Sequence, residues 1–132
     1  MTFVAPATAA LYVAVLGLAS AGLTANVIRN RVRSDVQAGD GGDARLACAI
    51  RAHANFCEQV PLALLLLVLA DALGASAIWV NGLGCLLLVA RAANAVGLTG
   101  SLGPTKPRQL GAALTLAMVV ACALLVLWRA TQ

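Results

Sequence analysis

The chain has 132 residues, of which 61% are hydrophobic and 11% are charged, and its mean hydropathy is +0.91. Soluble domains average about 45–50% apolar and about 25% charged residues. The composition therefore excludes an ordinary soluble domain and indicates one integral membrane domain over residues 1–132. The net charge of +4 does not indicate nucleic-acid binding, because aromatic residues, on which bases stack, make up only 4% of the chain.

Four uncharged or nearly uncharged stretches are long enough to cross a membrane, which takes about 20 apolar residues. They cover about residues 7–28, 46–73, 76–98 and 109–128. Short connections favour antiparallel neighbours, so we predict an all-α, up-down-up-down four-helix bundle surrounded by membrane lipid. The first stretch could instead be a cleaved signal peptide, but it lacks the basic segment that such a peptide needs.

The basic residues predict the orientation of the bundle. Six of them flank the first and third connections, namely Arg29, Arg31, Arg33, Arg45, Lys106 and Arg108. The other side has only Arg129, so the positive-inside rule puts the first and third loops in the cytoplasm and both termini outside. Asp43 stands just before the second stretch, where we expect it to cap the helix.

A polar stripe runs along the second stretch. Arg51, Asn55 and Glu58 are spaced i, i+4 and i+7, which places them on one face of a helix. Such residues are costly in lipid unless they face protein, water or a polar ligand. Arg91, late in the third stretch, lies at a depth where it could pair with Glu58. The stripe is therefore either a binding site or a polar contact between helices.

Other polar and thiol side chains have simpler interpretations. His53 lacks further ligands at metal-binding spacing, so we expect an interhelical hydrogen bond and no metal. Asn94 follows Arg91 by three residues and serves as a polar partner or as packing. The four cysteines contain no C-x-x-C pair and are interpreted as small packing residues. They are Cys48, Cys57, Cys85 and Cys122.

Guanidinium groups near the cytoplasmic face, with an amide and a carboxylate among them, suit a small molecule that carries carboxylates and an amine. The run from Arg51 through Asn55 and Glu58 to Pro61 resembles the second-helix signature of the MAPEG superfamily. These are membrane-associated proteins in eicosanoid and glutathione metabolism. A Gly-Asp-Gly-Gly segment just before the run and an Arg late in the third stretch add to the resemblance.

The resemblance implies a homotrimer that holds glutathione, as a co-substrate, between subunits near the cytoplasmic face. It assigns glutathione contacts to Arg51, Asn55 and Glu58, and a further contact to Arg31 or Arg33. Arg108 corresponds to the family's proposed thiol-activating Arg and is therefore the expected catalytic residue. Arg91, Asn94 and His53 are expected to support this site.

The chain departs from the eicosanoid-handling members of the family, which carry tyrosines late in the third helix and early in the fourth. Leu98, Ala112 and Ala113 stand in that region here, and the chain has no tyrosine after Tyr12. We therefore expect a general glutathione transferase or peroxidase acting on lipophilic electrophiles in a bacterial inner membrane. The alternatives are a small multidrug-type transporter, which typically needs an acidic residue in the first helix, and a non-catalytic membrane scaffold.

Overall fold

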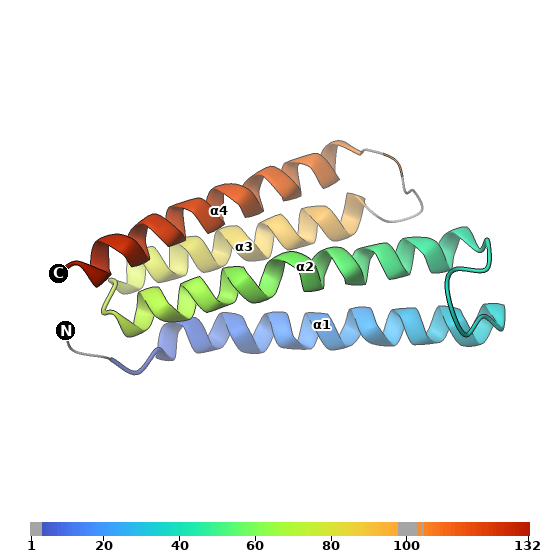
Figure 1. Cartoon of the computed structure of the whole chain (residues 1–132), viewed down its shortest axis with the longest axis horizontal. Coiled ribbons are helices and arrows are strands. Elements are labelled where there is room, and N and C mark those ends of the chain that lie inside the picture. The colour runs from blue at the N-terminus through green and yellow to red at the C-terminus, as the bar shows by residue number, and fades with distance from the viewer. Residues whose placement is uncertain (1–3, 98–102, 104) are drawn as a thin grey trace.

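A computed structural model describes residues 4–97, 103 and 105–132, and these residues form four helices without a strand. The helices are α1 (Ala7–Ser34), α2 (Ala44–Ala72), α3 (Ala77–Gly97) and α4 (Lys106–Ala130). Figure 1 shows them running alternately in opposite directions, with both termini and the α2–α3 turn at one end. The loop between α1 and α2 lies at the other end. The predicted all-α, up-down-up-down bundle is therefore confirmed.

The boundaries of α1 differ most from the prediction. The helix continues to Ser34 instead of ending near residue 28, because Arg is a good helix former and the end of the apolar stretch is not the end of the helix. It stops at Asp35, which has the left-handed φ of 50° and whose N–H bonds to the carbonyl of Arg31. The predicted last residue of the third helix, Leu98, lies outside the described residues.

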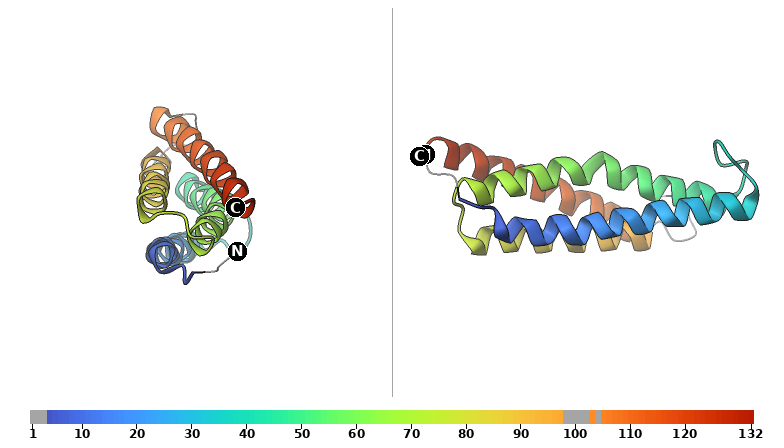
Figure 2. Two further views of the ribbon diagram at one scale, coloured as in Figure 1. Left: turned by 90° about the vertical axis from the view of Figure 1, so that its left-hand side faces the viewer. Right: turned by 90° about the horizontal axis from the view of Figure 1, so that it is seen from below.

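The helices differ in length, and this creates an overhang. The helices α1 and α2 have 28 and 29 residues, whereas α3 and α4 have 21 and 25. Figure 2, seen from below, shows α1 and α2 continuing past the other two at the end with the α1–α2 loop. Side chains on this two-helix extension therefore have fewer neighbours than those in the middle of the bundle.

The bundle has an apolar outside as well as an apolar core. Leu16, Leu67 and Leu87 are at most 2% exposed, whereas Leu18 and Ile78 are 76% and 84% exposed. All four helices are long and apolar enough to cross a membrane. Lipid is the environment that suits these outward-facing side chains, so the chain is an integral membrane protein.

Polar contacts hold the helices together at the end with the termini. The carboxylate of Asp71 on α2 accepts a 2.7 Å hydrogen bond from the backbone N–H of Ala9, in the first turn of α1. Tyr12 on α1 donates a 2.8 Å bond to the Asn81 side-chain oxygen on α3, and its ring lies against Gly84. These bonds take the place of the hydrogen bonds with water that the backbone and side-chain groups lose when the bundle buries them.

Candidate functional site

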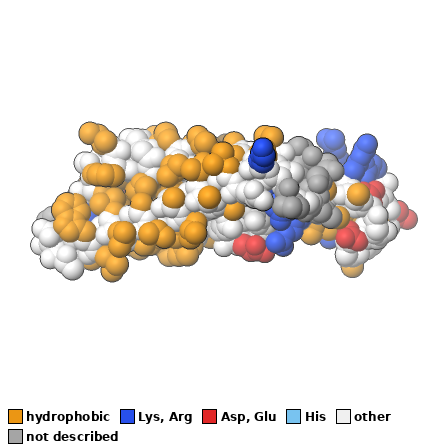
Figure 3. Space-filling model, turned by 90° about the horizontal axis from the view of Figure 1, so that it is seen from above, with side chains coloured by type: hydrophobic (Ala, Val, Ile, Leu, Met, Phe, Trp, Pro, Cys, Tyr) orange, Lys and Arg blue, Asp and Glu red, His pale blue; other side chains and the backbone are white. Residues whose placement is uncertain are grey.

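Charged side chains gather at one end of the molecule. In Figure 3 the Lys, Arg, Asp and Glu side chains on the visible face lie mainly toward the end with the α1–α2 loop, and hydrophobic side chains cover most of the remainder. This is the end where α1 and α2 extend past α3 and α4. A polar ligand would therefore meet the protein here, next to the apolar surface.

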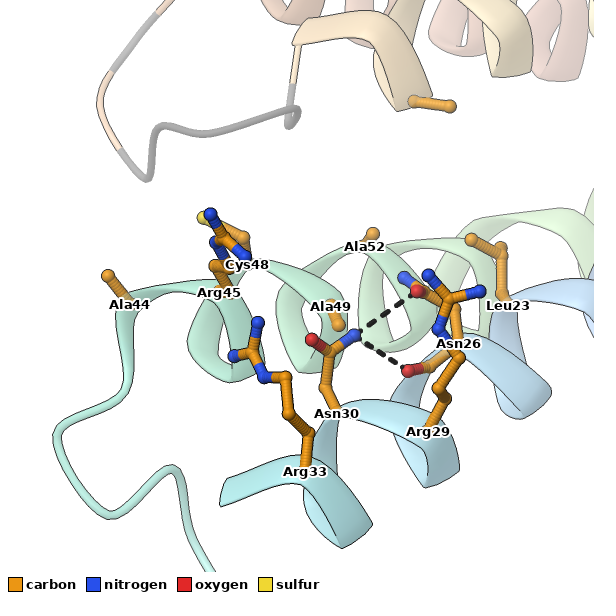
Figure 4. Close-up of a pocket in the computed structure, with 11 residues that line it drawn as sticks. Leu23, Asn26, Arg29, Asn30, Arg33, Ala44, Arg45, Cys48, Ala49 and Ala52 are labelled. Atoms are coloured by element: carbon orange, nitrogen blue, oxygen red, sulfur yellow. Dashed lines mark hydrogen bonds between the residues drawn. The ribbon is translucent and has the colours of Figure 1, made fainter.

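A cleft of about 550 Å³ opens on this extension, mainly between α1 and α2, and Figure 4 shows the side chains that line it. Ala95 adds one contact from α3. The polar residues of the cleft come from α1 and from the start of α2, and they are Asn26, Arg29, Asn30, Arg33 and Arg45. The floor is apolar and is made of small side chains, including Cys48, Ala49 and Ala52. The cleft therefore combines basic side chains with a floor of small apolar ones.

The polar side chains of the cleft are partly held in place. Asn30 donates a 2.8 Å bond to the backbone carbonyl of Asn26 and a 3.2 Å bond to its side-chain oxygen, drawn as dashed lines in Figure 4. Arg33 bonds to both carboxylate oxygens of Asp43, at 3.1 and 2.8 Å, through one terminal nitrogen. Because an exposed ion pair of this kind contributes little stability, a carboxylate ligand can compete for Arg33.

Asp43 also caps α2, as the sequence predicts. One of its oxygens accepts bonds from the backbone N–H groups of Arg45 and Leu46, at 2.8 and 2.9 Å. The Leu46 bond, followed by the Arg33 charge, lowers the pKa of Asp43 below its ordinary value of 3.8. The carboxylate therefore stays ionised at neutral pH and fixes the start of the helix that forms one wall of the cleft.

A smaller cavity of about 20 Å³ lies deeper than the cleft and shares Leu23, Ala52 and Ala95 with it. Three of the predicted site residues meet here, namely Asn55, Arg91 and Asn94. Asn55 comes from α2 and the other two come from α3. The sequence predicts that Asn55 shares a stripe with Arg51 and Glu58, whereas the structure brings Asn55 to Arg91 and Asn94 within the bundle.

Arg91 is buried and connects three helices. One terminal nitrogen donates a 3.1 Å bond to Asn55 on α2, and the other bonds to the Gly111 carbonyl at 3.3 Å and to the Thr115 hydroxyl, both on α4. Glu58, the partner suggested by depth along the helix, is exposed on the outside of α2. The two side chains share a depth but point in different directions.

His53 makes the interhelical bond expected of it. Its Nε2 lies 3.1 Å from the Thr24 hydroxyl on α1 and 3.6 Å from the Cys57 sulfur one turn along α2. The histidine therefore joins α1 to α2 beside the polar stripe.

The remaining predicted site residues lie away from the cleft in this single chain. Arg31 donates bonds to the carbonyls of Val36, Gln37 and Gly39 at 3.4, 3.1 and 3.0 Å, so it closes the α1–α2 loop. Arg51 is exposed and lines a separate shallow hollow beside that loop. Arg108 is half-buried at the start of α4, where it bonds to the Gly103 carbonyl at 3.4 Å.

Two basic residues of the cleft, Arg29 and Arg45, were not among the predicted ligand contacts. Both flank the first connection and were interpreted as markers of membrane orientation. The spacing of Arg29 and Arg33 at i and i+4 would have placed them on one face if the helix had been extended past residue 28. The missed signal is therefore the length of α1.

Comparison with known proteins shows the family to which the chain belongs. The model of the MAPEG family matches residues 9–128. The inner membrane protein YecN of Escherichia coli K12 is 35% identical over 82 residues, and that match covers 62% of this chain and 63% of YecN. YecN of E. coli O6:H1 strain CFT073 matches to the same extent. Because the family match spans nearly the whole bundle, from α1 to the end of α4, the chain belongs to the MAPEG family.

Proposed function

We propose that the chain is a glutathione-dependent transferase or peroxidase that acts on lipophilic electrophiles. The observation that carries the proposal is the basic cleft, with the guanidinium groups of Arg29, Arg33 and Arg45 around it. Glutathione has two carboxylates, and guanidinium groups bind carboxylates with paired hydrogen bonds. The cleft volume of about 550 Å³ is within the range of small-molecule sites, which is about 300–1,000 Å³.

The position of the cleft favours a reaction between a polar and an apolar substrate. Glutathione would approach from the charged end, and an electrophile dissolved in the bilayer would approach along the exposed apolar faces of the helices. A bound thiol would then lie where the two environments meet. This arrangement fits conjugation of a lipophilic molecule better than it fits the handling of two water-soluble substrates.

A homotrimer would complete the site. Arg51 and Glu58 are exposed on the outer face of α2, at positions where lipid contact is unfavourable. A neighbouring subunit that covered this face would bring both residues next to a bound ligand. Arg51 would then add a guanidinium group for the glutathione carboxylates, and Glu58 would hold its ammonium group.

The proposed chemistry needs the thiolate, which is the reactive form of glutathione. The guanidinium of Arg108 would stabilise that anion, and it would do so most strongly where water is scarce. In conjugation the thiolate forms a carbon–sulfur bond with the electrophile. The leaving group departs with its bonding electrons, and the thiol proton passes to solvent.

We also propose that the protein lies in the inner membrane with the cleft facing the cytoplasm. The relative YecN is described as an inner membrane protein, and four apolar helices suit the same location here. The positive-inside rule places the α1–α2 loop and the start of α4 in the cytoplasm. The cleft would then open toward cytoplasmic glutathione.

An activity assay on purified protein tests the proposal. Conjugation of glutathione to chlorodinitrobenzene and reduction of cumene hydroperoxide would be measured for the unaltered protein and for Arg33→Gln, Arg51→Gln and Lys106→Gln. We expect glutathione-dependent turnover with a raised KM for glutathione in the first two variants. Lys106 is exposed at the same end of the molecule, so Lys106→Gln controls for loss of one charge. Well-folded protein without turnover on either substrate would contradict the proposal.

A further inference from the structure

Arg91 is a buried cation whose hydrogen-bond partners are all uncharged. Arg91 is 7% exposed, and its guanidinium donates hydrogen bonds to Asn55, Gly111 and Thr115. An ion in a poorly hydrated interior is unfavourable unless an opposite charge accompanies it. In the described part of the chain no carboxylate bonds to Arg91. The positive charge of Arg91 therefore has no carboxylate counterion among the described residues, although it lies in a poorly hydrated interior.

Two hydrogen-bond donors at this site have no partner among the described residues. They are the Nε of Arg91 and the Nδ2 of Asn94, a residue that is 4% exposed. Both residues line the cavity of about 20 Å³ described above. Buried donors without a partner are rare because each one loses the hydrogen bond that water would give it. An occupant of the cavity that accepts hydrogen bonds would satisfy both.

The size of the cavity limits that occupant to about one atom. A cavity needs roughly 10–15 Å³ to hold a single water molecule, so about 20 Å³ admits one water or one monatomic ion and excludes glutathione. Water would pair the two donors but would leave the Arg91 charge uncompensated. A monatomic anion would accept both bonds and also neutralise the charge.

We propose that the cavity formed by Asn55, Arg91 and Asn94 binds one halide ion, with chloride as the natural occupant. The ion would reach it through the cleft, which shares three lining residues with the cavity. Arg91 joins α2, α3 and α4, so an ion that compensates its charge would stabilise the packing of all three helices. This site is distinct from the proposed glutathione cleft and does not depend on catalysis.

Thermal unfolding without glutathione tests the proposal. Purified protein would be melted during titration with sodium chloride or sodium bromide, at constant ionic strength made up with sodium gluconate. A ligand that binds only folded protein raises Tm saturably with its concentration. We expect that rise with both halides and none with gluconate. Halide-specific broadening of the chlorine-35 NMR signal would report the same binding directly.

Two variants locate the effect. Asn94→Asp is nearly isosteric and supplies a carboxylate beside Arg91, so we expect Tm in gluconate at or above the unaltered protein's value and no halide response. Arg29→Gln removes a charge from the outer cleft and should leave the halide response intact. An unaltered protein that melts identically in chloride and gluconate would overturn the proposal in favour of water. A response lost in Arg29→Gln but kept in Asn94→Asp would overturn it in favour of ion binding in the cleft.

Discussion

Gly84 on α3 lies directly against the ring of Tyr12 on α1. A Cβ atom at this position would lie 2.5–2.6 Å from three ring carbons. Favourable contacts between carbon atoms are about 3.5–4.0 Å long, so Gly84→Ala must move the ring or separate the helices. The ring is not free to move, because its hydroxyl bonds to Asn81 at 2.8 Å.

The size of the effect follows from a comparison within the same helix. A Cβ atom on Gly82 would meet no described atom within 4 Å, so Gly82→Ala gains only the helix propensity of alanine, about 1 kcal/mol. Gly84→Ala makes the same propensity gain but adds overpacking, which typically costs about 1–3 kcal/mol. We therefore expect Gly84→Ala to be less stable than Gly82→Ala by about 1–3 kcal/mol.

Reversible unfolding in mixed micelles with increasing SDS, followed by tryptophan fluorescence, measures both variants under one set of conditions. Gly82→Ala is the matched control, because it makes the same substitution in the same helix only two residues away. Equal stability of the two variants would refute the assigned contact between α1 and α3. Restored stability when Gly84→Ala is combined with a smaller side chain at position 12 would confirm its cause.

Two further predictions concern hydrogen bonds at opposite ends of the bundle. Tyr12→Phe keeps the ring but loses the bond to Asn81, and it should lower the free energy of unfolding by about 0.6 kcal/mol in the same SDS titration, the average for such bonds in membranes, whose largest values are about 1.7 kcal/mol; unchanged stability would argue against the bond. Asp43 has a lowered pKa in the folded protein, so the cap stabilises α2 fully above its ordinary pKa of 3.8 and is lost as pH falls through the lower folded value. The protection factor of the Leu46 amide, which corrects for the intrinsic pH dependence of exchange, should therefore fall at that acidic pH, whereas Asp43→Asn, an equally good cap, should make the protection factor independent of this titration; a protection factor in the unaltered protein that does not respond to acid would count against the cap.

The sequence was sufficient for the features that depend on hydrophobic length and local spacing. Four apolar stretches predicted four helices, and Asp43 and His53 made the cap and the interhelical bond expected of them. These inferences need only the period of the helix and the cost of leaving polar groups unpaired in lipid.

The sequence was insufficient where the rotation of one helix about its axis decides the contact. Depth alone allowed Arg91 to meet Glu58, but packing turns Arg91 toward Asn55 and α4. Arg31 likewise shares its segment with Arg33, yet Arg31 bonds to the loop and Arg33 faces the cleft. Residues two positions apart on a helix point in nearly opposite directions. The sequence therefore shows which of these arginines faces a ligand only once the helix is known to continue through both of them.

Glutathione binding to the purified protein tests the functional account most directly. Isothermal titration would compare the unaltered protein with Arg33→Gln and Arg51→Gln, and with Lys106→Gln as the matched loss of charge outside the cleft. We expect saturable binding that is weakened in the first two variants and unchanged in Lys106→Gln. Absence of binding at millimolar glutathione in a well-folded protein would contradict the glutathione site while leaving the four-helix fold intact. Glutathione binding that Arg33→Gln leaves unchanged would show that the cleft is not where glutathione is held.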